Sequence, residues 1–462
     1  MNRTALLSIF FLFTVFSLSA QDERVSQSLN PDKVISYPPD WSRSATIYEV
    51  NLRQYTPSGT IREFIPHLER LQKMGVGVLW VMPVQPIGVK NRKGSLGSYY
   101  SISDYKAVSP EFGTMDDWIE LVNNAHELGM YVILDWVANH TAFDHPWITE
   151  HPDYYVHNDA GEIKSPVDDW TDAADLNYDN QQMRQEMIAS MAFWVRKTHI
   201  DGFRCDVADL VPTDFWPAAR EKLEGAQPGL FMLAESENPE LHTKAFDMTY
   251  TWTLFHRLND IAAGKKNAKE IDAYLVEQKA WPKNAFRMYF TSNHDENSWN
   301  GSNHEKMGPA SQTFAVLTFG MNGMPLIYSG QEANLSKRLR FFDRDTIPWN
   351  DYPYEGFYTK LAQLKSAEKA LEHGDRGGDF IKLKTGNDEN VFAFIRKNGN
   401  SKVLFILNLS ANDQKIRIEN SDIAGSSTEL FTDAPQTWKS AVSLKLKPWE
   451  YSVYRYNAEP KH

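Results

Sequence analysis

In each of four short segments of this sequence, a carboxylate residue lies within an apolar run or directly after it. They read DWVANH (135–140), GFRCDVAD (202–209), MLAES (232–236) and FTSNHDEN (290–297). Two carboxylates held about 5 to 5.5 Å apart can break a glycosidic bond with retention, one as nucleophile and one as acid. Asp206, Glu235 and Asp295 are candidates for that chemistry, provided that the fold brings them together.

Strand-like and helix-like segments alternate along most of the chain, as in a mostly parallel barrel. The catalytic groups of such a barrel lie at the carboxyl ends of its strands, which is where the four segments place their polar residues. We therefore predict an α/β fold: a (β/α)8 TIM barrel with a short insertion after strand 3 and a C-terminal antiparallel β-sandwich. The eight predicted strands are 46–51, 76–82, 131–137, 202–207, 231–234, 246–250, 287–291 and 325–328.

Two changes of pattern indicate the domain organisation. Residues 138–180 are rich in aromatic, Asp, Asn, Pro and His residues but show little periodicity, which is typical of a functional excursion. After residue 374, strand-like segments separated by Gly, Asn and Asp turns predict a sandwich. Its predicted strands read VFAFIRK, SKVLFILNLS, QKIRIEN, VSLKLKP and EYSVYRY. We predict a signal peptide at 1–20, a barrel at 21–137 and 181–375, an insertion (domain B) at 138–180, and the sandwich at 376–462.

The first residues are typical of an export signal. Arg3 precedes the apolar run 5–18, and small residues at 17–20 offer a cleavage site. The run is shorter than the roughly 20 residues that a spanning helix needs, so we expect no stable membrane span, with an uncleaved anchor as the alternative. No cysteine follows the run, so lipid attachment is not expected. The protein is predicted to be secreted or periplasmic.

Composition excludes several classes of protein. Hydrophobic residues make up 42% of the 462 residues and aromatics 13%, enough for a large core. A net charge of -12 argues against nucleic acid as a partner. Cys205 is the single cysteine, so no internal disulfide can form. A reactive thiol needs an electropositive environment, which the neighbouring carboxylate of Asp206 opposes, so we expect Cys205 to be a small buried apolar residue.

Taken together, the four segments, their order, the insertion and the C-terminal strands resemble the α-amylase family of glycoside hydrolases (glycoside hydrolase family 13). The resemblance extends over roughly 41–456. It implies that Asp206 is the nucleophile, Glu235 the general acid and base, and Asp295 a carboxylate that binds sugar hydroxyls and helps to distort the ring. Two alternatives remain open: Glu237 as the acid, and Asp295 as a helix cap.

The resemblance also implies the residues that bind the cleaved sugar. His140 and His294 match its two histidines, Asp135 a strand-end carboxylate, and Tyr100 a tyrosine that stacks on the sugar, with Tyr99 as its rival. Arg204 is expected to keep Asp206 ionised, although a plain salt bridge would use the same pair.

A structural calcium ion is implied by two further matches. Asn139 and Asp175 correspond to residues that bind calcium in many relatives, and oxygen ligands suit this hard cation. Two ligands do not make a site with six to eight ligands, so the alternative is no metal. No organic cofactor is implied.

The function implied is retaining hydrolysis of α-glucosidic bonds in starch-type glucans and maltooligosaccharides, as by an α-amylase. One departure weakens the transfer of endo-acting starch specificity: Ala208 and Asp209 stand where starch-cleaving relatives often have Lys-His. An exo-acting α-glucosidase, a cyclomaltodextrinase or a transglycosylase of the same family is the first alternative. A non-catalytic glycan-binding member is the second, and it would typically lack one of the three carboxylates. The sequence leaves the oligomeric state open.

Overall fold

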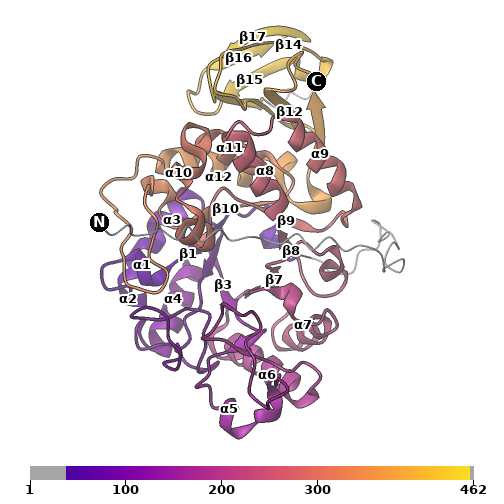
Figure 1. The fold of residues 1–462 in the computed structure, drawn as a ribbon. Helices are drawn as coiled ribbons and strands as arrows, with labels where there is room; N and C mark the ends of the chain where they lie inside the picture. Colours follow the sequence, from indigo (N-terminus) through magenta and orange to yellow (C-terminus); the bar gives the residue numbers. More distant parts are fainter. Residues whose placement is uncertain (1–37, 458–462) are drawn as a thin grey trace, which may run out of the picture.

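A closed parallel barrel forms the centre of the molecule. The computed structural model describes residues 38–457, so the predicted signal peptide lies outside the described residues. Eight strands pair in the order β1-β10-β9-β8-β7-β6-β3-β2 and confirm the predicted barrel (Figure 1). Their bounds are β1 Ile47–Val50, β2 Val78–Val81, β3 Tyr131–Trp136, β6 Gly202–Cys205, β7 Phe231–Ala234, β8 Met248–Tyr250, β9 Phe286–Tyr289 and β10 Met324–Tyr328.

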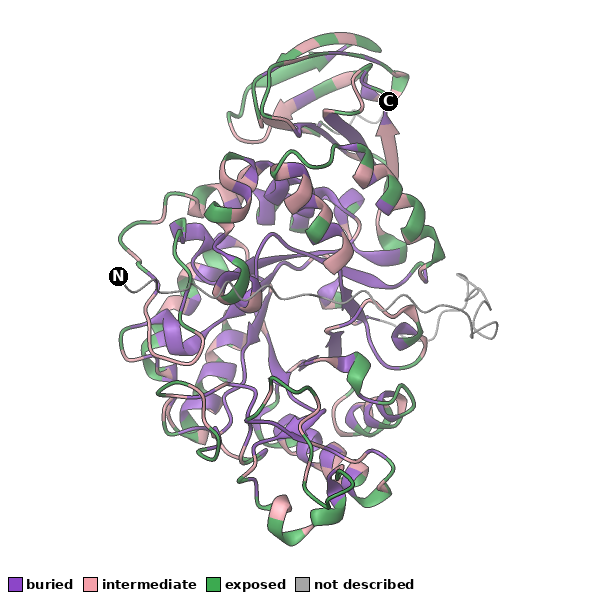
Figure 2. Cartoon of the chain, in the orientation of Figure 1, coloured by how far each residue is buried: buried purple, intermediate pink, exposed green. Residues whose placement is uncertain are grey.

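Helices surround the barrel and shield its strands from solvent. Figure 2 shows buried strands inside helices whose outer faces are exposed, as expected for a parallel sheet covered by amphipathic helices. Local signals fix some helix starts: Thr114 and Asp117 form a capping box at α4, and the Asn180 side chain accepts from two backbone N–H groups at α6. The helices are α1 Leu52–Tyr55, α2 Ile61–Phe64, α3 Leu68–Met74, α4 Met115–Glu127, α5 Trp147–Glu150, α6 Gln181–Thr198, α7 Phe215–Ala226, α8 Trp252–Ala262, α9 Lys269–Glu277, α10 Asn303–Met307, α11 Ser311–Gly320 and α12 Glu355–Ala367. None of the helices within 38–457 is both long and apolar enough to cross a membrane.

The excursion after β3 contains little regular structure. Strands β4 (His140–Thr141) and β5 (Ala174–Asp175) pair antiparallel, so His140 lies opposite Asp175. The short helix α5 lies between them in the sequence and at the end of the molecule away from the C-terminal sheets (Figure 1). The pairing of β4 with β5 returns the chain to the barrel before α6 begins.

Antiparallel sheets form the C-terminal part, as predicted. One sheet has the order β11-β12-β13-β18-β15-β16, and β14 pairs with β17. The sequence analysis missed β11, β15 and β16; the polar segment GSSTE of β15 lacks the apolar alternation that indicates a strand. The strands are β11 Asp379–Leu383, β12 Val391–Asn398, β13 Ser401–Asn408, β14 Gln414–Glu419, β15 Gly425–Glu429, β16 Pro435–Trp438, β17 Ala441–Leu446 and β18 Tyr451–Tyr456.

The C-terminal sheet shares its core with the barrel. Phe394 and Phe405 stack on each other with ring centroids 4.7 Å apart, and both belong to the buried cluster that fills the barrel. Arg396 is buried beside them and donates from Nη1 to the carbonyl oxygen of Gly320 at the end of α11, 3.0 Å away. The two parts are therefore packed as one body through β12, β13 and α11.

Candidate active site

Strands β6, β7 and β9 bring the three candidate carboxylates to one end of the barrel. Asp206 directly follows β6 and Glu235 directly follows β7, and these strands pair with each other. Asp295 follows β9, directly before a π-helical turn at Glu296–Asn300. Their side chains are 10%, 14% and 35% exposed, so solvent reaches each of them. The distant segments of the sequence thus converge on one site.

Arg204 forms ion pairs with two of these carboxylates. Its side chain is fully buried, with Nη1 2.9 Å from Asp206 Oδ1 and 2.8 Å from Asp135 Oδ1. Nη2 forms an ion pair with Glu235 Oε2 at 2.8 Å, and Nε donates to the hydroxyl of Tyr250 at 3.1 Å. One guanidinium therefore contacts three carboxylates. This arrangement differs from the plain Arg204–Asp206 salt bridge that was the alternative.

Burial and mutual repulsion set the charge state of this cluster. Burial raises the pKa of Asp206 well above its ordinary value, and Glu235, Asp135 and Asp295 add to the rise. Arg204 lowers this pKa, as expected from the sequence, but does not outweigh the other effects. Burial likewise raises the pKa of Asp295, with His294 opposing the rise. The site therefore holds more carboxylates than cations, and Asp206 and Asp295 keep their protons to higher pH than isolated carboxylic acids do.

His294 links Asp295 to the residues predicted to bind sugar. Its Nδ1 lies 2.5 Å from Glu49 Oε1, and its Nε2 lies 2.7 Å from the Tyr100 hydroxyl and 3.3 Å from Asp295 Oδ2. The Tyr100 hydroxyl donates to Asp135 Oδ2 at 3.1 Å. Burial alone would lower the pKa of His294, but Asp295 and Glu49 outweigh it and raise the pKa to about 9. His294 is thus an imidazolium at neutral pH.

The second predicted histidine has a different environment. His140 is buried on β4, with its ring 5.4 Å from that of Trp170 in the excursion. Burial lowers the pKa of His140 to about 4, opposed by a hydrogen bond with the backbone of Tyr100. His140 is therefore a neutral hydrogen-bonding group, whereas His294 is a cation.

The structure also places the residues left open as alternatives. Glu237 is held by Arg287 Nη2 at 3.0 Å and by the Thr253 backbone N–H and hydroxyl, whereas Glu235 accepts from the backbone N–H of Val207 at 2.9 Å. Glu237 thus has its own partners outside the cluster. Asp295 occupies a helix-cap position but makes no side-chain capping hydrogen bond.

Tyr99, the rival of Tyr100, points away from the carboxylates. Its hydroxyl donates to Asn51 Oδ1 at 3.1 Å and its ring lies 4.0 Å from the Arg53 guanidinium. Tyr100 instead stacks on His294, with centroids 5.4 Å apart. Of the two tyrosines, only Tyr100 therefore contacts the residues that are predicted to bind sugar.

The two residues predicted to bind calcium lie near each other. The carbonyl oxygen of Asn139 accepts from the N–H of Leu176, next to Asp175. Burial raises the pKa of Asp175 to about 6, opposed by Lys164, so its carboxylate has a cation nearby. Within 38–457 no group of three or more His, Cys, Asp or Glu side chains is arranged to hold a metal. These residues alone do not fit a site with six to eight ligands.

Three residues of the site escaped the sequence analysis. Glu49 lies on β1 and pairs with His294. Its carboxylate within an otherwise apolar strand was the feature of the sequence that could have identified it. Tyr250 on β8 accepts from Arg204. Val207 adopts φ 37°, a left-handed conformation that costs energy for a β-branched residue, and its N–H donates to Glu235. Only the tertiary structure shows that strain.

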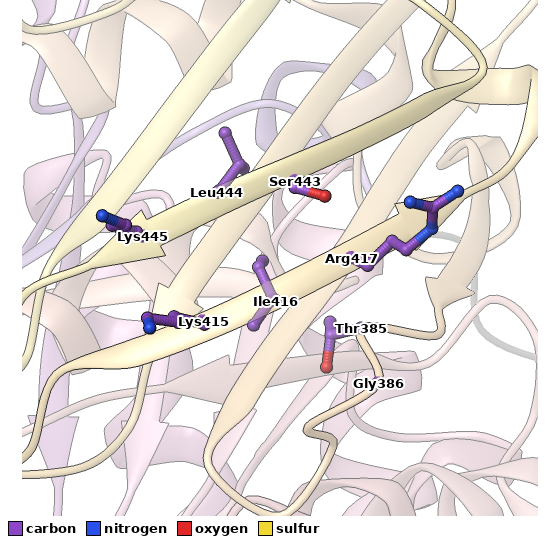
Figure 3. Close-up of a pocket in the computed structure, with 8 residues that line it drawn as sticks. All are labelled: Thr385, Gly386, Lys415, Ile416, Arg417, Ser443, Leu444 and Lys445. Carbon is purple, nitrogen blue, oxygen red and sulfur yellow. The ribbon is translucent and has the colours of Figure 1, made fainter.

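A hollow of different character lies on the C-terminal sheets. Its volume is about 470 Å³, and it is lined by residues of the paired strands β14 and β17 and by the loop at Thr385 and Gly386 (Figure 3). Lys415, Arg417 and Lys445 line it, and no carboxylate or aromatic ring does. It has none of the groups needed for glycoside cleavage.

A parallel barrel with paired carboxylates beside an arginine at the ends of adjacent strands has the architecture of a glycoside hydrolase. Comparison with known families agrees. Residues 27–369 match the family described as alpha amylase, catalytic domain, and residues 391–453 match the alpha-amylase SusG C-terminal domain. The chain belongs to the alpha-amylase family of glycoside hydrolases.

Similar proteins and solved structures belong to the same family. A maltogenic alpha-amylase, AmyB, from Thermotoga neapolitana is 30% identical with a TM-score of 0.82, covering 89% of this chain and 98% of that one. An alpha-amylase from Lactobacillus plantarum is 30% identical with a TM-score of 0.81, covering 90% and 99%. Alpha-amylase MalA of Haloarcula japonica is 26% identical over 81% of this chain and 56% of its own length, so the chain spans about half of that relative.

Proposed function

We propose that the protein hydrolyses α-glucosidic bonds in starch-type glucans and maltooligosaccharides with retention of configuration. Asp206 attacks the anomeric carbon and forms a covalent glycosyl-enzyme, while Glu235 protonates the leaving oxygen and then deprotonates the attacking water. The observation that carries the proposal is the single guanidinium of Arg204 in contact with both Asp206 and Glu235 on adjacent strands. That contact fixes the nucleophile and the acid beside each other.

The other residues of the cluster bind and polarise the cleaved sugar. Asp295, Asp135 and the His294 imidazolium offer charged partners for its hydroxyl groups, and Tyr100 offers a flat ring. The neutral His140 completes this side from the excursion. Because positive charge develops on the sugar ring in the transition state, the excess of carboxylates stabilises it more than the ground state.

The first test is anomer-resolved NMR of products from maltoheptaose and soluble starch. We expect α-anomers with the intact enzyme and no product with Asp206→Asn. β-Anomers would contradict retention, and product from the variant would remove Asp206 from the role of nucleophile. If no sugar is released from either substrate, the non-catalytic, glycan-binding alternative replaces this proposal.

Two further predictions of the sequence belong to this proposal. Export by the 1–20 segment is supported by its residue pattern, and N-terminal sequencing of the mature protein tests it. A structural calcium ion at Asn139 and Asp175 would need backbone oxygens or water as additional ligands. Elemental analysis of purified protein and a melting curve with and without EDTA test for that ion.

A further inference from the structure

The order of strands in the barrel defines two sides of the catalytic site. β7, which carries Glu235 at its end, lies four strands from β1 whichever way the barrel is followed. The acid must contact the leaving oxygen, so the leaving part of a substrate lies toward β7. The part that is retained on the enzyme, the donor, therefore extends from the cleaved sugar toward β1.

Segments that follow β2 and β10 meet on this donor side. The backbone N–H of Leu96 donates to Phe342 O at 2.9 Å, and the N–H and hydroxyl of Ser95 donate to Asp343 Oδ1 at 2.8 and 2.6 Å. Gly94 has φ +62°, and a Cβ there would lie 2.5 Å from Phe342 Cβ. The two segments thus touch without space for a side chain between them.

The first of these segments also contacts the excursion after β3. Asn91 Nδ2 donates to Thr171 O at 3.0 Å, and Lys93 Nζ donates to Asp169 O at 2.6 Å. Lys93 Nζ also lies 3.2 Å from the buried carboxylate of Asp172. Residues 91–97, 169–172 and 341–343 therefore form a continuous connection between the excursion and the segment after β10, which we call the donor-end barrier.

A buried arginine directly after β1 holds this barrier in place. Arg53, on α1, donates from Nη1 to Gly97 O at 2.9 Å and to Phe341 O at 3.1 Å. Its other nitrogens bind both oxygens of Glu111 at 2.7 and 3.0 Å. Because a bidentate pair fixes the guanidinium plane, both halves of the barrier are attached to one rigid group.

Aromatic rings lead from the catalytic residues to the barrier. Phe341 stacks near Tyr100 with centroids 6.2 Å apart, and on its other side it lies 5.0 Å from Trp299. Trp299 is 45% exposed, unusual for so large an apolar side chain. Such a ring offers a flat apolar face to a sugar next to the one that Tyr100 contacts.

We propose that the donor-end barrier closes the donor side of the catalytic site, so that the enzyme removes short segments from non-reducing chain ends. This inference rests on the proposed function and adds the direction of attack to it. A chain that continues beyond the barrier would have to pass through the contacts of Ser95 and Leu96 with the 341–343 segment. Only a chain that ends before the barrier fits, with Trp299 beside its last sugars.

A pair of substrates that differ only at the non-reducing end tests the inference. Maltoheptaosides with a free end and with an ethylidene group across the terminal O4 and O6 are digested separately, and the products are identified by mass spectrometry. We expect cleavage of the free substrate and at least about 100-fold slower cleavage of the blocked one, which corresponds to about 2.7 kcal/mol. Similar rates on both would overturn the barrier while leaving the proposed function intact. Failure to cleave either would overturn both.

Mutations that weaken the donor-end barrier should reduce the difference in rate between the free and the blocked substrate. The double variant Lys93→Ala, Asp343→Ala removes a side-chain contact on each flank. The control Lys90→Ala removes a cation just before the barrier, whose Nζ lies 5.8 Å from the centre of the Phe143 ring. We expect the double variant to gain activity on the blocked substrate by about tenfold or more and Lys90→Ala to leave it unchanged. No gain in a folded double variant, or an equal gain in both, would contradict the barrier.

A time course on amylose with the intact enzyme gives a measurement that needs no variant. We expect one short product from the earliest samples while the iodine colour of the polymer is largely kept. An early mixture of long and short products with rapid loss of colour would show internal attack and overturn the inference.

Discussion

The environment of each side chain, more than its type, decides what it can do in this site. His140 and His294 are both motif histidines, yet burial lowers the pKa of His140 to about 4. His294 is equally buried but faces Asp295 and Glu49, and its pKa is raised to about 9. Of the two histidines predicted to bind sugar, one is therefore neutral and can accept a hydrogen bond, whereas the other is charged and can only donate.

The ion pair of His294 with Glu49 should make stability depend on pH. Because the pKa in the folded protein lies above the ordinary value, the pair contributes fully below about pH 6.5, and the contribution is lost as the pH rises through about 9. The variant His294→Gln should show a flatter decline of Tm between pH 6.5 and 9 than the wild type. Melting curves across that range check this, and parallel declines would remove His294 as the titrating group.

Substrates with different leaving groups should distinguish the role of Glu235 from that of Asp206. Loss of a general acid costs roughly 10²- to 10⁴-fold on substrates with poor leaving groups. Glu235→Gln should therefore be nearly inactive on maltotriose but should release a burst of fluoride from α-maltosyl fluoride, whose leaving group needs no proton. Steady turnover should stay slow, because the second step still lacks its base. Asp206→Asn should be inactive on both. Glu237→Gln is the matched control, because Glu237 binds Arg287 outside the cluster, and it should keep most activity on maltotriose.

At the scale of elements, β6 brings Arg204 and Asp206 to the site only because it packs closely on β7. Gly202 begins β6 with φ +154°, and a Cβ there would lie 1.8 Å from the carbonyl oxygen of Phe231 on β7. The contact involves backbone, which cannot move aside without breaking the pairing that places Asp206 beside Glu235. A glycine at this position is therefore a requirement of the site as well as of the strand.

Replacing this glycine should be costly. We expect Gly202→Ala to lower the free energy of unfolding by about 3 kcal/mol or more, or to prevent folding. Gly225→Ala, near the end of α7 with nothing within 4 Å of the new Cβ, should instead leave stability unchanged or raise it by up to about 1 kcal/mol. Urea unfolding of the two variants measures the difference, and equal stabilities would contradict the close approach of β6 and β7.

For the whole molecule, the shared core predicts one cooperative unit. Phe394, Phe405 and Val453 from the C-terminal sheets belong to the same buried cluster as the barrel, and Arg396 bonds to the end of α11. Calorimetry should therefore show a single unfolding transition. A chain truncated after Gly378 should be insoluble or melt at least about 10 °C lower, because it would expose the apolar face of α11. Two separate transitions, or a stable truncated barrel, would contradict this view.

The sequence was sufficient to predict the architecture. All eight barrel strands were located, because buried parallel strands are short apolar runs between helical segments. The polar strand β15 was missed, because its residues carry no apolar alternation and it forms only through pairing with β16 and β18. The predicted sugar-binding residues Asp135 and His294 lie together near the ends of β3 and β9, and the loop after β2 brings Tyr100 to them.

What the sequence by itself determined is the set of chemical groups and the strands that present them, since both follow from residue type and local pattern. Only the tertiary structure decided how those groups are charged and what surrounds them. Glu49 controls His294 from 245 residues away in the sequence, and Arg53 joins segments around residues 97 and 341. Charge state and closure of the site depend on distances between remote segments, and these exist only when the barrel has closed.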